Sequence, residues 1–507
     1  MIWIIDFGSQ YTQLIIRKSR KIGFNPELMV YEEFCERLKT SKPDAIILSG
    51  GPSSVYEDTN NYDSLFKLKV PVLGICYGMQ VMAHFFGGVV QKGELGEYGK
   101  STVQSFSDLP DKIDVWMSHF DIVEKVPDLF EVVYISENKI IAGMESKEKK
   151  LLALQFHPEV NETDKGEEIF EYFYTEVASL QKNWNQQSRL DICKESFNIV
   201  KDDEFVLCGF SGGVDSLVAA QIAHQCVRNR LVCVYIDHGL MRPQDEKHIQ
   251  LLSKSLDLEI LKIDSSQVFL NRLVGVSDPE GKRKTMGKTF VEEFERIVKK
   301  IENKKKISFK YLLQGTLFPD VIESISPHKK NGKSVTIKSH HNVGGLPEKM
   351  NLSLIEPLRY MFKDEVREIG VEIGLEKKWV FRHPFPGPGL GVRILGALDN
   401  ESILATKKSD QILYEELIRN DLYDDIWQAF TVFLPIKTVG VKGDERAYEN
   451  VVCIRMVNSI DGMTAKWSKV SLSFLDKVSS RITNEVKGIT RVVYDITSKP
   501  PGTIEWE

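Results

Sequence analysis

A cysteine, a histidine and a glutamate in the first third of the chain have the residue types and spacing of a nucleophilic catalytic group. Cys76 lies in the segment GICYG, which follows the apolar run PVL and precedes a helical pattern. Glycines on both sides of a cysteine allow a sharp turn from strand to helix, and the start of a helix lowers the pKa of a thiol. The segment therefore has the form of a nucleophile elbow, and a buried structural cysteine is the alternative.

His157 and Glu159 supply partners for this thiol. They follow the apolar run 151–156, and residues two apart in an extended segment point to the same side. The proline between them favours an extended conformation at His157. A base whose ring is oriented by a carboxylate is the arrangement that activates a nucleophile. Together with Cys76, these residues predict a cysteine nucleophile with its general base.

A second group of residues, near the middle of the chain, could hold phosphate. The apolar run 205–208 is followed by the turn SGG at 211–213, and Asp215 then opens a segment with helical spacing. The start of a helix carries unpaired N–H groups and partial positive charge, and glycines let the backbone close around an anion. Neither GxxxxGK[ST] nor GxGxxG fits these glycines. We expect a phosphate loop of another kind, with a plain tight turn as the alternative.

The elements around these residues predict two doubly wound α/β domains with mostly parallel sheets. In residues 1–185, apolar runs alternate with amphipathic stretches, which is typical of a parallel sheet covered by helices on both faces. Functional groups then gather at the carboxyl ends of the strands. The polar segment 181–188 has neither periodicity and predicts a linker. We expect the second domain over 189–382.

A third, smaller domain is expected over 383–507. The proline- and glycine-rich segment RHPFPGPGL at 382–390 interrupts any helix or strand. Beyond it, strand patterns at 437–441, 451–457 and 491–496 accompany one long helical pattern at 470–486. This mixture predicts a small α+β domain.

Composition limits the classes of partner. The net charge of −6 over 507 residues gives no general attraction for nucleic acid or for an anionic membrane. No apolar run approaches the roughly 18 residues that span a bilayer, and no signal peptide is evident, so we expect a cytoplasmic protein. The seven cysteines are scattered without a CxxC pair, which argues against a disulfide framework or a zinc site.

The hexapeptide SGGVDS at 211–216 resembles the signature of the ATP pyrophosphatases. The resemblance implies that ATP is split between its α and β phosphates and that a carbonyl oxygen of the substrate is adenylated. Asp237 ends the next apolar strand, where an acidic side chain could accept a hydrogen bond from ribose or adenine. Magnesium is expected with ATP, and Asp215 is its candidate ligand. The predicted ATP contacts are Ser211, Gly212, Gly213, Val214, Asp215, Ser216, Leu217 and Asp237.

The cysteine elbow and the HPE segment together resemble the class I glutamine amidotransferases. The resemblance implies that Cys76 attacks the amide of glutamine, that His157 acts as general acid and base, and that Glu159 orients it. It also implies an oxyanion hole made by the backbone N–H groups of Gly51 and Tyr77. The predicted glutamine contacts are Gln80, Ser118 and His119. Phe120 departs from the glycine that many relatives have before Asp121.

Over essentially its whole length, the chain resembles the glutamine-hydrolysing GMP synthetases. The further motifs that carry this resemblance are, in order, DPEGKRK, QGTLFPDVIES, RHPFPGPGL, SIDGMTAKW and KPPGTIEWE. The family adenylates the purine O2 of XMP with ATP, and ammonia then displaces AMP to give GMP. Its third domain pairs two subunits in bacterial members, so we expect a homodimer. The XMP contacts that the resemblance implies are Arg283, Gln428, Lys499, Ile504 and Glu505.

Two other interpretations remain open at this point. Another amidotransferase of the same two modules, such as an NAD synthetase or a tRNA thiolase, would share the cysteine elbow and SGGVDS but would lack KPPGTIEWE. A thiolase would also need further reactive cysteines and a basic RNA-binding face. The alternative from a different class is a catalytically silent nucleotide sensor, against which the intact Cys76, His157 and Glu159 argue.

Overall fold

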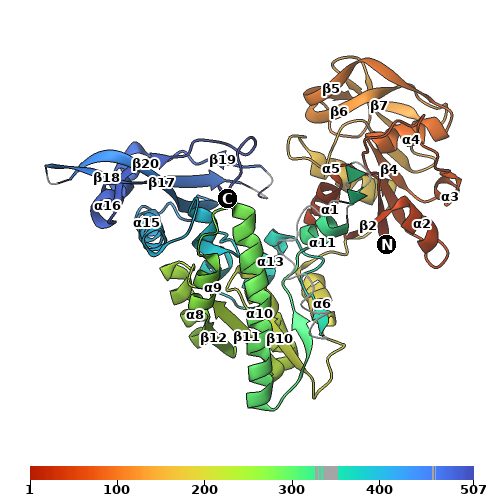
Figure 1. Cartoon of the computed structure of the whole chain (residues 1–507). Helices are drawn as coiled ribbons and strands as arrows, with labels where there is room; N and C mark the ends of the chain where they lie inside the picture. The colour runs from red at the N-terminus through yellow and green to blue at the C-terminus, as the bar shows by residue number, and fades with distance from the viewer. Residues whose placement is uncertain (326–328, 331–332, 335–351, 443, 460–461, 463) are drawn as a thin grey trace. The chain divides into compact units, whose positions relative to one another are not determined.

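The computed structural model describes residues 1–507 except for 326–328, 331–332, 335–351, 443, 460–461 and 463, so part of the motif SIDGMTAKW lies outside the described residues. The chain divides into two compact units, Met1–Arg189 and Leu190–Glu507 (Figure 1). The predicted boundary at 382 falls inside the second unit, and the division into three domains stays a prediction. Among the described residues, no helix combines the length and the hydropathy that a membrane span requires.

The first unit is built on a nine-stranded sheet with the order β2-β1-β3-β4-β9-β8-β7-β5-β6. Its strands from β2 to β9 pair in parallel, and the others pair antiparallel. The parallel strands are β1 (Ile2–Asp6), β2 (Pro26–Val30), β3 (Ala45–Leu48), β4 (Val72–Ile75) and β9 (Leu151–Leu154). The antiparallel strands are β5 (Val89–Ser105), β6 (Ile113–Lys125), β7 (Glu131–Ser136) and β8 (Ile141–Ser146).

The central parallel strands of this sheet are buried along their length because helices cover them. Strands β3, β4 and β9 consist of buried residues only, as expected for the centre of a sheet with apolar runs. The core around them contains Trp3, Ile46 and Met79. The helices are α1 (Thr12–Lys21), α2 (Tyr31–Arg37), α3 (Asp63–Phe66), α4 (Tyr77–Phe85), α5 (Gly166–Tyr172), the π-helix η1 (Phe173–Val177) and α6 (Gln186–Glu195), which runs into the second unit.

The second unit contains a five-stranded parallel sheet with the order β12-β11-β10-β13-β16. These strands are β10 (Phe205–Gly209), β11 (Leu231–Asp237), β12 (Ile260–Asp264), β13 (Phe309–Leu313) and β16 (Ser353–Ile355). The order of the strands reverses at β10, because β11 lies on one side of it and the later β13 on the other. In open α/β sheets, ligands bind at the carboxyl ends of the strands at this reversal. The loop that follows β10 is SGGVDS.

Helices connect these strands and surround the sheet (Figure 1). They are α7 (Val214–Val227), η2 (Arg228–Arg230), α8 (Pro243–Ser255), α9 (Ser266–Leu273), α10 (Pro279–Lys305), α11 (Phe318–Ile325), α13 (Lys363–Glu372), α14 (Lys377–Val380) and η3 (Gly389–Arg393). A two-stranded ladder of β14 (Lys329–Lys330) and β15 (Lys333–Ser334) follows α11. The fold class is thus α/β, as predicted, with large sheets that contain parallel strands.

The last part of the second unit is a four-stranded sheet with two helices against it (Figure 1). The sheet consists of β17 (Gln428–Lys442), β18 (Glu445–Asn458), β19 (Lys466–Trp467) and β20 (Ile489–Tyr494). Strand β18 pairs with each of the other three. The helices α15 (Asn400–Arg419) and α16 (Leu472–Glu485) pack on this sheet and on each other. The predicted strands at 437–441 and 451–457 fall within β17 and β18, and the predicted segments 491–496 and 470–486 overlap β20 and α16 but extend one or two residues beyond them.

Candidate active site

Cys76 lies between β4 and α4 in a backbone conformation that is rare for any residue except glycine. Its φ is 53° and its ψ is −105°, and such outliers persist only where the surrounding structure enforces them. The N–H of Cys76 donates to the carbonyl of Leu154 at 2.7 Å. A Cβ at Gly74 would lie 2.7 Å from the carbonyl oxygen of Gly78, and a Cβ at Gly78 would lie 2.5 Å from that of Leu48. Both glycines of the elbow are therefore needed for its tight turn.

His157 and Glu159 form a buried pair just beyond β9. The Nδ1 atom of His157 lies 2.7 Å from Oε1 of Glu159, and both side chains are at most 3% exposed. Burial works to lower the pKa of His157, but the charge of Glu159 and hydrogen bonds with Cys76 and Glu159 outweigh it and raise that pKa well above its usual value. A histidine beside a cysteine, with its ring oriented by a carboxylate, is the arrangement that cysteine nucleophiles use.

Two further groups contact the sulfur of Cys76, and sequence reasoning missed one of them. The Nε2 of Gln155 and the carbonyl oxygen of Ser118 each lie 3.7 Å from Sγ. Gln155 is fully buried, and it precedes His157 by two residues, so the spacing that linked His157 to Glu159 could also have identified it. Its amide N–H points at the position where negative charge would sit on the thiolate.

Tyr11 is another neighbour of His157 that no motif indicated. Its ring lies edge-on to the imidazole, with 4.9 Å between the ring centroids and an angle of 68°. The indole N–H of Trp116 donates to the Tyr11 hydroxyl at 3.3 Å, and the carbonyl of Trp116 accepts the His157 backbone N–H at 3.0 Å. Tyr11 therefore packs on the imidazole, and Trp116 holds both Tyr11 and the backbone of His157.

The predicted oxyanion residues approach each other closely. A Cβ at Gly51 would lie 3.3 Å from Cδ1 of Tyr77 and 2.8 Å from the carbonyl oxygen of Phe7. Among the described residues, no hydrogen-bond acceptor is assigned to the backbone N–H of Gly51 or of Tyr77. Two free N–H groups beside a nucleophile could stabilise a developing oxyanion.

The predicted glutamine contacts differ in how available they are. Gln80 donates from Nε2 to the carbonyl of Asp121 at 2.9 Å, and the Ser118 carbonyl faces Cys76. Both ring nitrogens of His119 have hydrogen-bond partners. Nε2 lies 3.1 Å from Oε2 of Glu97, and Nδ1 lies 3.1 Å from the carbonyl oxygen of Asp121. The contact of His119 with glutamine stays a prediction.

In the second unit, the SGGVDS segment forms the end of the turn after β10 and the first three residues of α7. Gly212 has a φ of +76°, and a Cβ there would lie 2.2 Å from Cδ1 of Ile249 in α8. The hydroxyl of Ser216 donates to the carbonyl of Gly213 and lies 3.0 Å from that of Ser211. The N–H of Gly213 donates to Ser211 Oγ at 3.3 Å. Gly213 caps the 14-residue helix α7, so the loop places a helix N-terminus at the reversal of the sheet.

The remaining predicted ATP contacts lie at the start of α7 and at the end of β11. Val214 begins α7, and Leu217 is buried and donates its N–H to Gly213. The Oδ1 of Asp237 accepts the N–H of Gly239 at 2.9 Å. Asp237 also lines a cavity of about 450 Å³ at the carboxyl ends of β11 and β12. Asp264, Ser266 and Lys407 line the same cavity.

Asp215, the candidate magnesium ligand, is paired with a lysine. Both of its carboxylate oxygens accept from Nζ of Lys363, at 2.7 and 2.6 Å. Among the described residues, no group of three acidic, cysteine or histidine side chains could cage a metal. Magnesium that arrives with a nucleotide takes most of its ligands from phosphate and water, so a single carboxylate fits this role.

The structure brings together some of the predicted XMP contacts. The amide of Gln428 donates to Oε1 of Glu505 at 2.8 Å, and Ile504 packs on the buried face of β17 and β18. Lys499 donates to the carbonyl of Gly462 at 2.7 Å. Arg283 lies 3.9 Å from Glu280 in its own helix.

Lys282, the residue before Arg283 in the motif DPEGKRK, is fully buried. Its Nζ donates to the carbonyl of Ile394 at 2.6 Å and pairs with Glu507. Lys282 thus links α10 to Glu507, two residues beyond Glu505. The sequence pattern does not show that Lys282 is buried, because its partners Ile394 and Glu507 lie far away along the chain.

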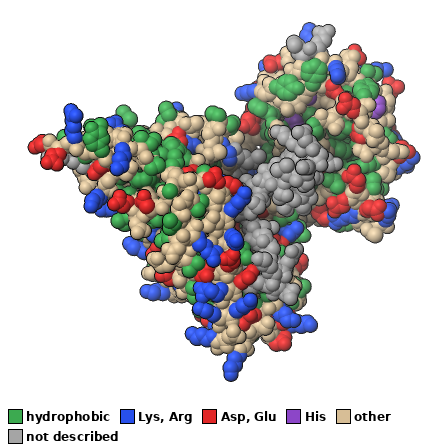
Figure 2. Space-filling model, viewed as in Figure 1, with side chains coloured by type: hydrophobic (Ala, Val, Ile, Leu, Met, Phe, Trp, Pro, Cys, Tyr) green, Lys and Arg blue, Asp and Glu red, His purple; other side chains and the backbone are tan. Residues whose placement is uncertain are grey.

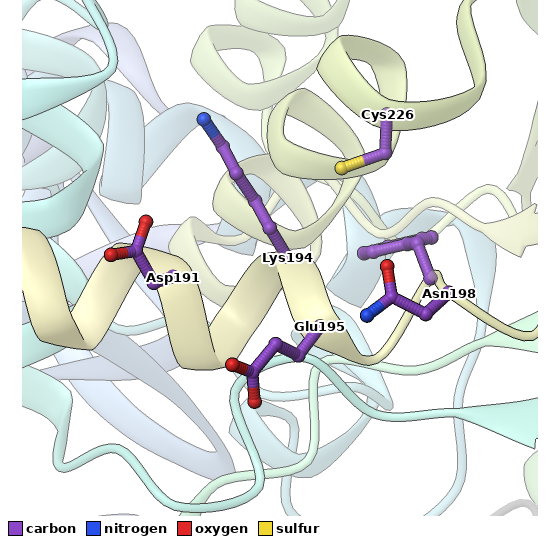
Figure 3. Close-up of a pocket in the computed structure, with 6 residues that line it drawn as sticks. Asp191, Lys194, Glu195, Asn198 and Cys226 are labelled. Carbon is purple, nitrogen blue, oxygen red and sulfur yellow. The ribbon is translucent and has the colours of Figure 1, made fainter.

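A second cavity carries none of the predicted residues. It has a volume of about 360 Å³ and lies where α6 approaches the end of α7 (Figure 3). Burial raises the pKa of Cys226, so this thiol stays protonated at neutral pH. Its lining residues are Asp191, Lys194, Glu195, Phe197, Asn198 and Cys226.

Three family models match successive parts of the chain. They are glutamine amidotransferase class-I over residues 3–177, NAD synthase over 188–305, and the GMP synthase C terminal domain over 415–506. The first two cover the cysteine elbow and the SGGVDS loop. The third distinguishes the chain from an NAD synthetase.

Relatives described as "GMP synthase [glutamine-hydrolyzing]" match along the whole chain. That of Thermosipho melanesiensis is 49% identical over 99% of this chain and 99% of its own. That of Helicobacter pylori strain J99 is 48% identical over 100% of both chains, and that of Aquifex aeolicus is 46% identical over 100% of this chain and 99% of its own. The resemblance inferred from the motifs is confirmed: the chain belongs to the family of glutamine-hydrolysing GMP synthases.

Proposed function

We propose that this enzyme aminates XMP to GMP with ammonia from glutamine, and that it splits ATP into AMP and pyrophosphate in doing so. The observation that carries the proposal is the presence of two chemical centres in one chain: the Cys76, His157 and Glu159 cluster of the first unit and the SGGVDS loop at the sheet reversal of the second. Membership of the family supports the purine acceptor, because the matched relatives are named for GMP.

In the first centre, the Cys76 thiolate attacks the side-chain amide carbon of glutamine. His157, whose pKa is raised, gives its proton to the departing ammonia and takes one from the water that hydrolyses the thioester. Glu159 fixes the ring through the 2.7 Å bond to Nδ1. The N–H groups of Gly51 and Tyr77 are placed to stabilise the oxyanion of each tetrahedral intermediate.

Replacing Glu159 by glutamine should move the basic limb of the pH profile for glutamine hydrolysis to lower pH. The charge of Glu159 raises the pKa of His157, so without it the imidazolium loses its proton at a lower pH. Because proton transfer by a well-positioned base contributes at least about a hundredfold, kcat/KM should also fall, by about tenfold to a hundredfold. Steady-state ammonia release across pH measures both effects. The exposed neighbour variant Glu162→Gln should retain the wild-type profile, and an unmoved limb in Glu159→Gln would contradict the pairing.

In the second centre, the loop 211–216 and the start of α7 hold the β and γ phosphates of ATP. The purine O2 of XMP attacks the α phosphorus, pyrophosphate leaves, and ammonia then displaces AMP from C2. Magnesium would neutralise phosphate charge, with Asp215 as its protein ligand. Lys363 forms an ion pair with Asp215 and contacts the departing phosphates. Gln428, Glu505, Lys499 and Arg283 bind XMP, with Glu505 accepting from purine N–H groups.

The same proposal divides the chain into residues 1–185, 189–382 and 383–507 and assigns a homodimer contact to the last part. Val439, Val441 and Tyr448 are half or more exposed, and Val439 pairs with Tyr448 across the hairpin of β17 and β18. Hydrophobic side chains are visible over this sheet in Figure 2. An apolar patch on a sheet suits a second copy of the chain.

Replacing Val441 by lysine should therefore break the dimer. A charge in the middle of an apolar contact has to be desolvated without a partner, which costs about 2 kcal/mol or more and weakens association by at least about tenfold. Light scattering during size-exclusion chromatography measures the mass. A wild-type protein that elutes as a monomer would contradict the dimer, and a dimeric Val441→Lys variant would place its contact elsewhere.

The function is tested by mixing the protein with XMP, ATP, magnesium and glutamine and identifying the products. We expect GMP, AMP, pyrophosphate and glutamate in equal amounts. ADP with orthophosphate would contradict the proposal. If the protein aminated deamido-NAD at a rate comparable to that with XMP, XMP would not be its specific acceptor. The proposed chemistry of the two centres would still hold.

A further inference from the structure

Arg393 is a fully buried arginine beside the proposed XMP contacts. It ends η3, and its Nε and Nη2 donate to the two carboxylate oxygens of Glu505 at 3.1 and 2.8 Å. Its guanidinium lies 4.1 Å from the ring centroid of Phe430 and 5.0 Å from that of Phe385. An arginine fork held on both oxygens of a carboxylate fixes the plane of that carboxylate, which a lysine cannot do.

The opposite edge of Arg393 faces a second buried charge. Its Nη1 lies 3.9 Å from Oδ1 of Asp410 in α15 and has no hydrogen-bond partner among the described residues. Asp410 is itself held, because Oδ1 accepts the N–H of Thr431 at 3.0 Å and Oδ2 accepts from Gln244 at 3.2 Å. Asp410 also lies 3.7 Å from Arg242. The charge of Asp410 therefore fixes the far edge of the guanidinium and turns its Nε edge toward Glu505.

Helix α8 lies between the charged residues around Arg393 and the loop of the SGGVDS segment. Arg242, which precedes α8, pairs with Asp245 at 2.6 Å, and Asp245 also accepts from Arg382. Further along α8, Ile249 packs against Gly212. Buried charges are stable only when they are paired, and the three cations Arg242, Arg382 and Arg393 balance the three anions Asp245, Asp410 and Glu505. Glu505 is the anion of this group that reaches the surface, since 22% of its side chain is exposed, whereas Asp245 and Asp410 are buried.

The hydrogen bonds of Glu505 leave one of its oxygens available. Oε1 accepts from both Arg393 and Gln428, whereas Oε2 accepts from Arg393 alone among the described residues. A carboxylate oxygen accepts at least two hydrogen bonds. We propose that Arg393 is a positioning residue for XMP, which holds the Glu505 carboxylate oriented so that Oε2 accepts from a purine N–H. This inference rests on the proposed function, because it takes Glu505 as an XMP contact.

The test is the XMP dependence of GMP formation with ammonium salt in place of glutamine, which bypasses the first centre. Arg393→Lys should raise the KM for XMP about tenfold or more, because the charge remains but the fork is lost. The KM for ATP should change by less than about twofold, because the charged partners of Arg393 among the described residues are Glu505 and Asp410, and neither is a predicted ATP contact. The matched control is Arg481→Lys: Arg481 also pairs with carboxylates, those of Glu415, Glu416 and Glu485, and this variant should leave both constants unchanged.

A double-mutant cycle separates positioning from general damage. If Arg393 acts through Glu505, Arg393→Lys should have almost no further effect on the KM for XMP once Glu505→Gln is present, whereas a structural role would give additive losses. Unchanged XMP dependence in Arg393→Lys, or additivity with Glu505→Gln, would overturn the inference. Failure of the wild type to form GMP would refute the proposed function, and a normal KM in Glu505→Gln would refute the assignment of Glu505.

A second variant keeps the test decisive if Arg393→Lys does not fold. Asp410→Asn is isosteric and keeps an oxygen for the Thr431 N–H, but it removes the charge that faces Nη1 of Arg393. We expect the KM for XMP to rise about threefold in this variant, since the fork is loosened and not lost. An unchanged KM in a folded Asp410→Asn protein would overturn the inference.

Discussion

Replacing Cys76 by alanine should abolish GMP formation from glutamine and leave GMP formation from ammonium salt unchanged. The thiolate of Cys76 makes the covalent bond to the glutamine carbon, and no neighbouring group on His157 or Gln155 can replace it. Loss of a nucleophile costs about 10⁴-fold or more in kcat. The second unit has its own chemistry at 211–216, so it should still use ammonia that is supplied directly. Measuring GMP from each nitrogen source tests both statements.

Cys35→Ala is the matched control for this variant. Cys35 lies in α2 of the same unit, is partly buried, and has the Tyr31 hydroxyl as a polar neighbour. It should retain both activities. If Cys76→Ala lost the ammonia-dependent activity as well, Cys76 would have a role beyond that of a nucleophile. If it kept the glutamine-dependent activity, the elbow would not be the site of attack.

The parts of both centres that are local in the sequence could be predicted from it. Cys76 sits between glycines that the tight turn requires, and His157 and Glu159 are brought together by the two-residue repeat of an extended chain. The SGGVDS loop likewise combines a strand, a turn and a helix start within one segment. In such cases the backbone pattern alone determines which side chains meet.

Contacts between distant segments could not be predicted in this way. Arg393 meets Glu505 112 residues later, and Lys282 meets Glu507 225 residues later. Their pairing depends on how α10, η3 and the last residues pack, and a buried arginine looks like a surface arginine in the sequence. The antiparallel strands β5–β8 were also not identified, because long hairpins with mixed exposure lack the apolar runs that marked the parallel strands.

The ring of His119 illustrates the same limit. The motif placed His119 among the glutamine contacts, but both ring nitrogens bind other groups, including Glu97 on β5. Burial works to raise the pKa of Glu97, and hydrogen bonds from His119, Asn138 and Ser136 lower it below its usual range. The motif pointed to His119 as a residue, whereas only the structure shows that its side chain binds Glu97 on the neighbouring strand β5.

Replacing Gly212 by alanine should reduce ATP cleavage about a hundredfold without affecting glutamine hydrolysis. A φ of +76° costs a non-glycine residue about 1 to 3 kcal/mol. The added Cβ would also lie 2.2 Å from Cδ1 of Ile249, which is 3% exposed and surrounded by packed neighbours. Either the loop or α8 must move, and a shift of about 1 Å in groups that position a substrate can cost about a hundredfold in rate. Pyrophosphate release with XMP and ammonium salt measures the loss.

Gly275→Ala separates this effect from backbone strain. Gly275 has the same φ of +76° in the same unit, but no atom lies within 4 Å of the position of its Cβ. Gly275→Ala should lose about 1 to 3 kcal/mol of free energy of unfolding through backbone strain alone, and Gly212→Ala should lose at least as much, but only Gly212→Ala should lose ATP cleavage. Equal activities in the two variants would show that the loop tolerates a side chain at 212. In that case the contact between Gly212 and α8 would not determine the shape of the phosphate site.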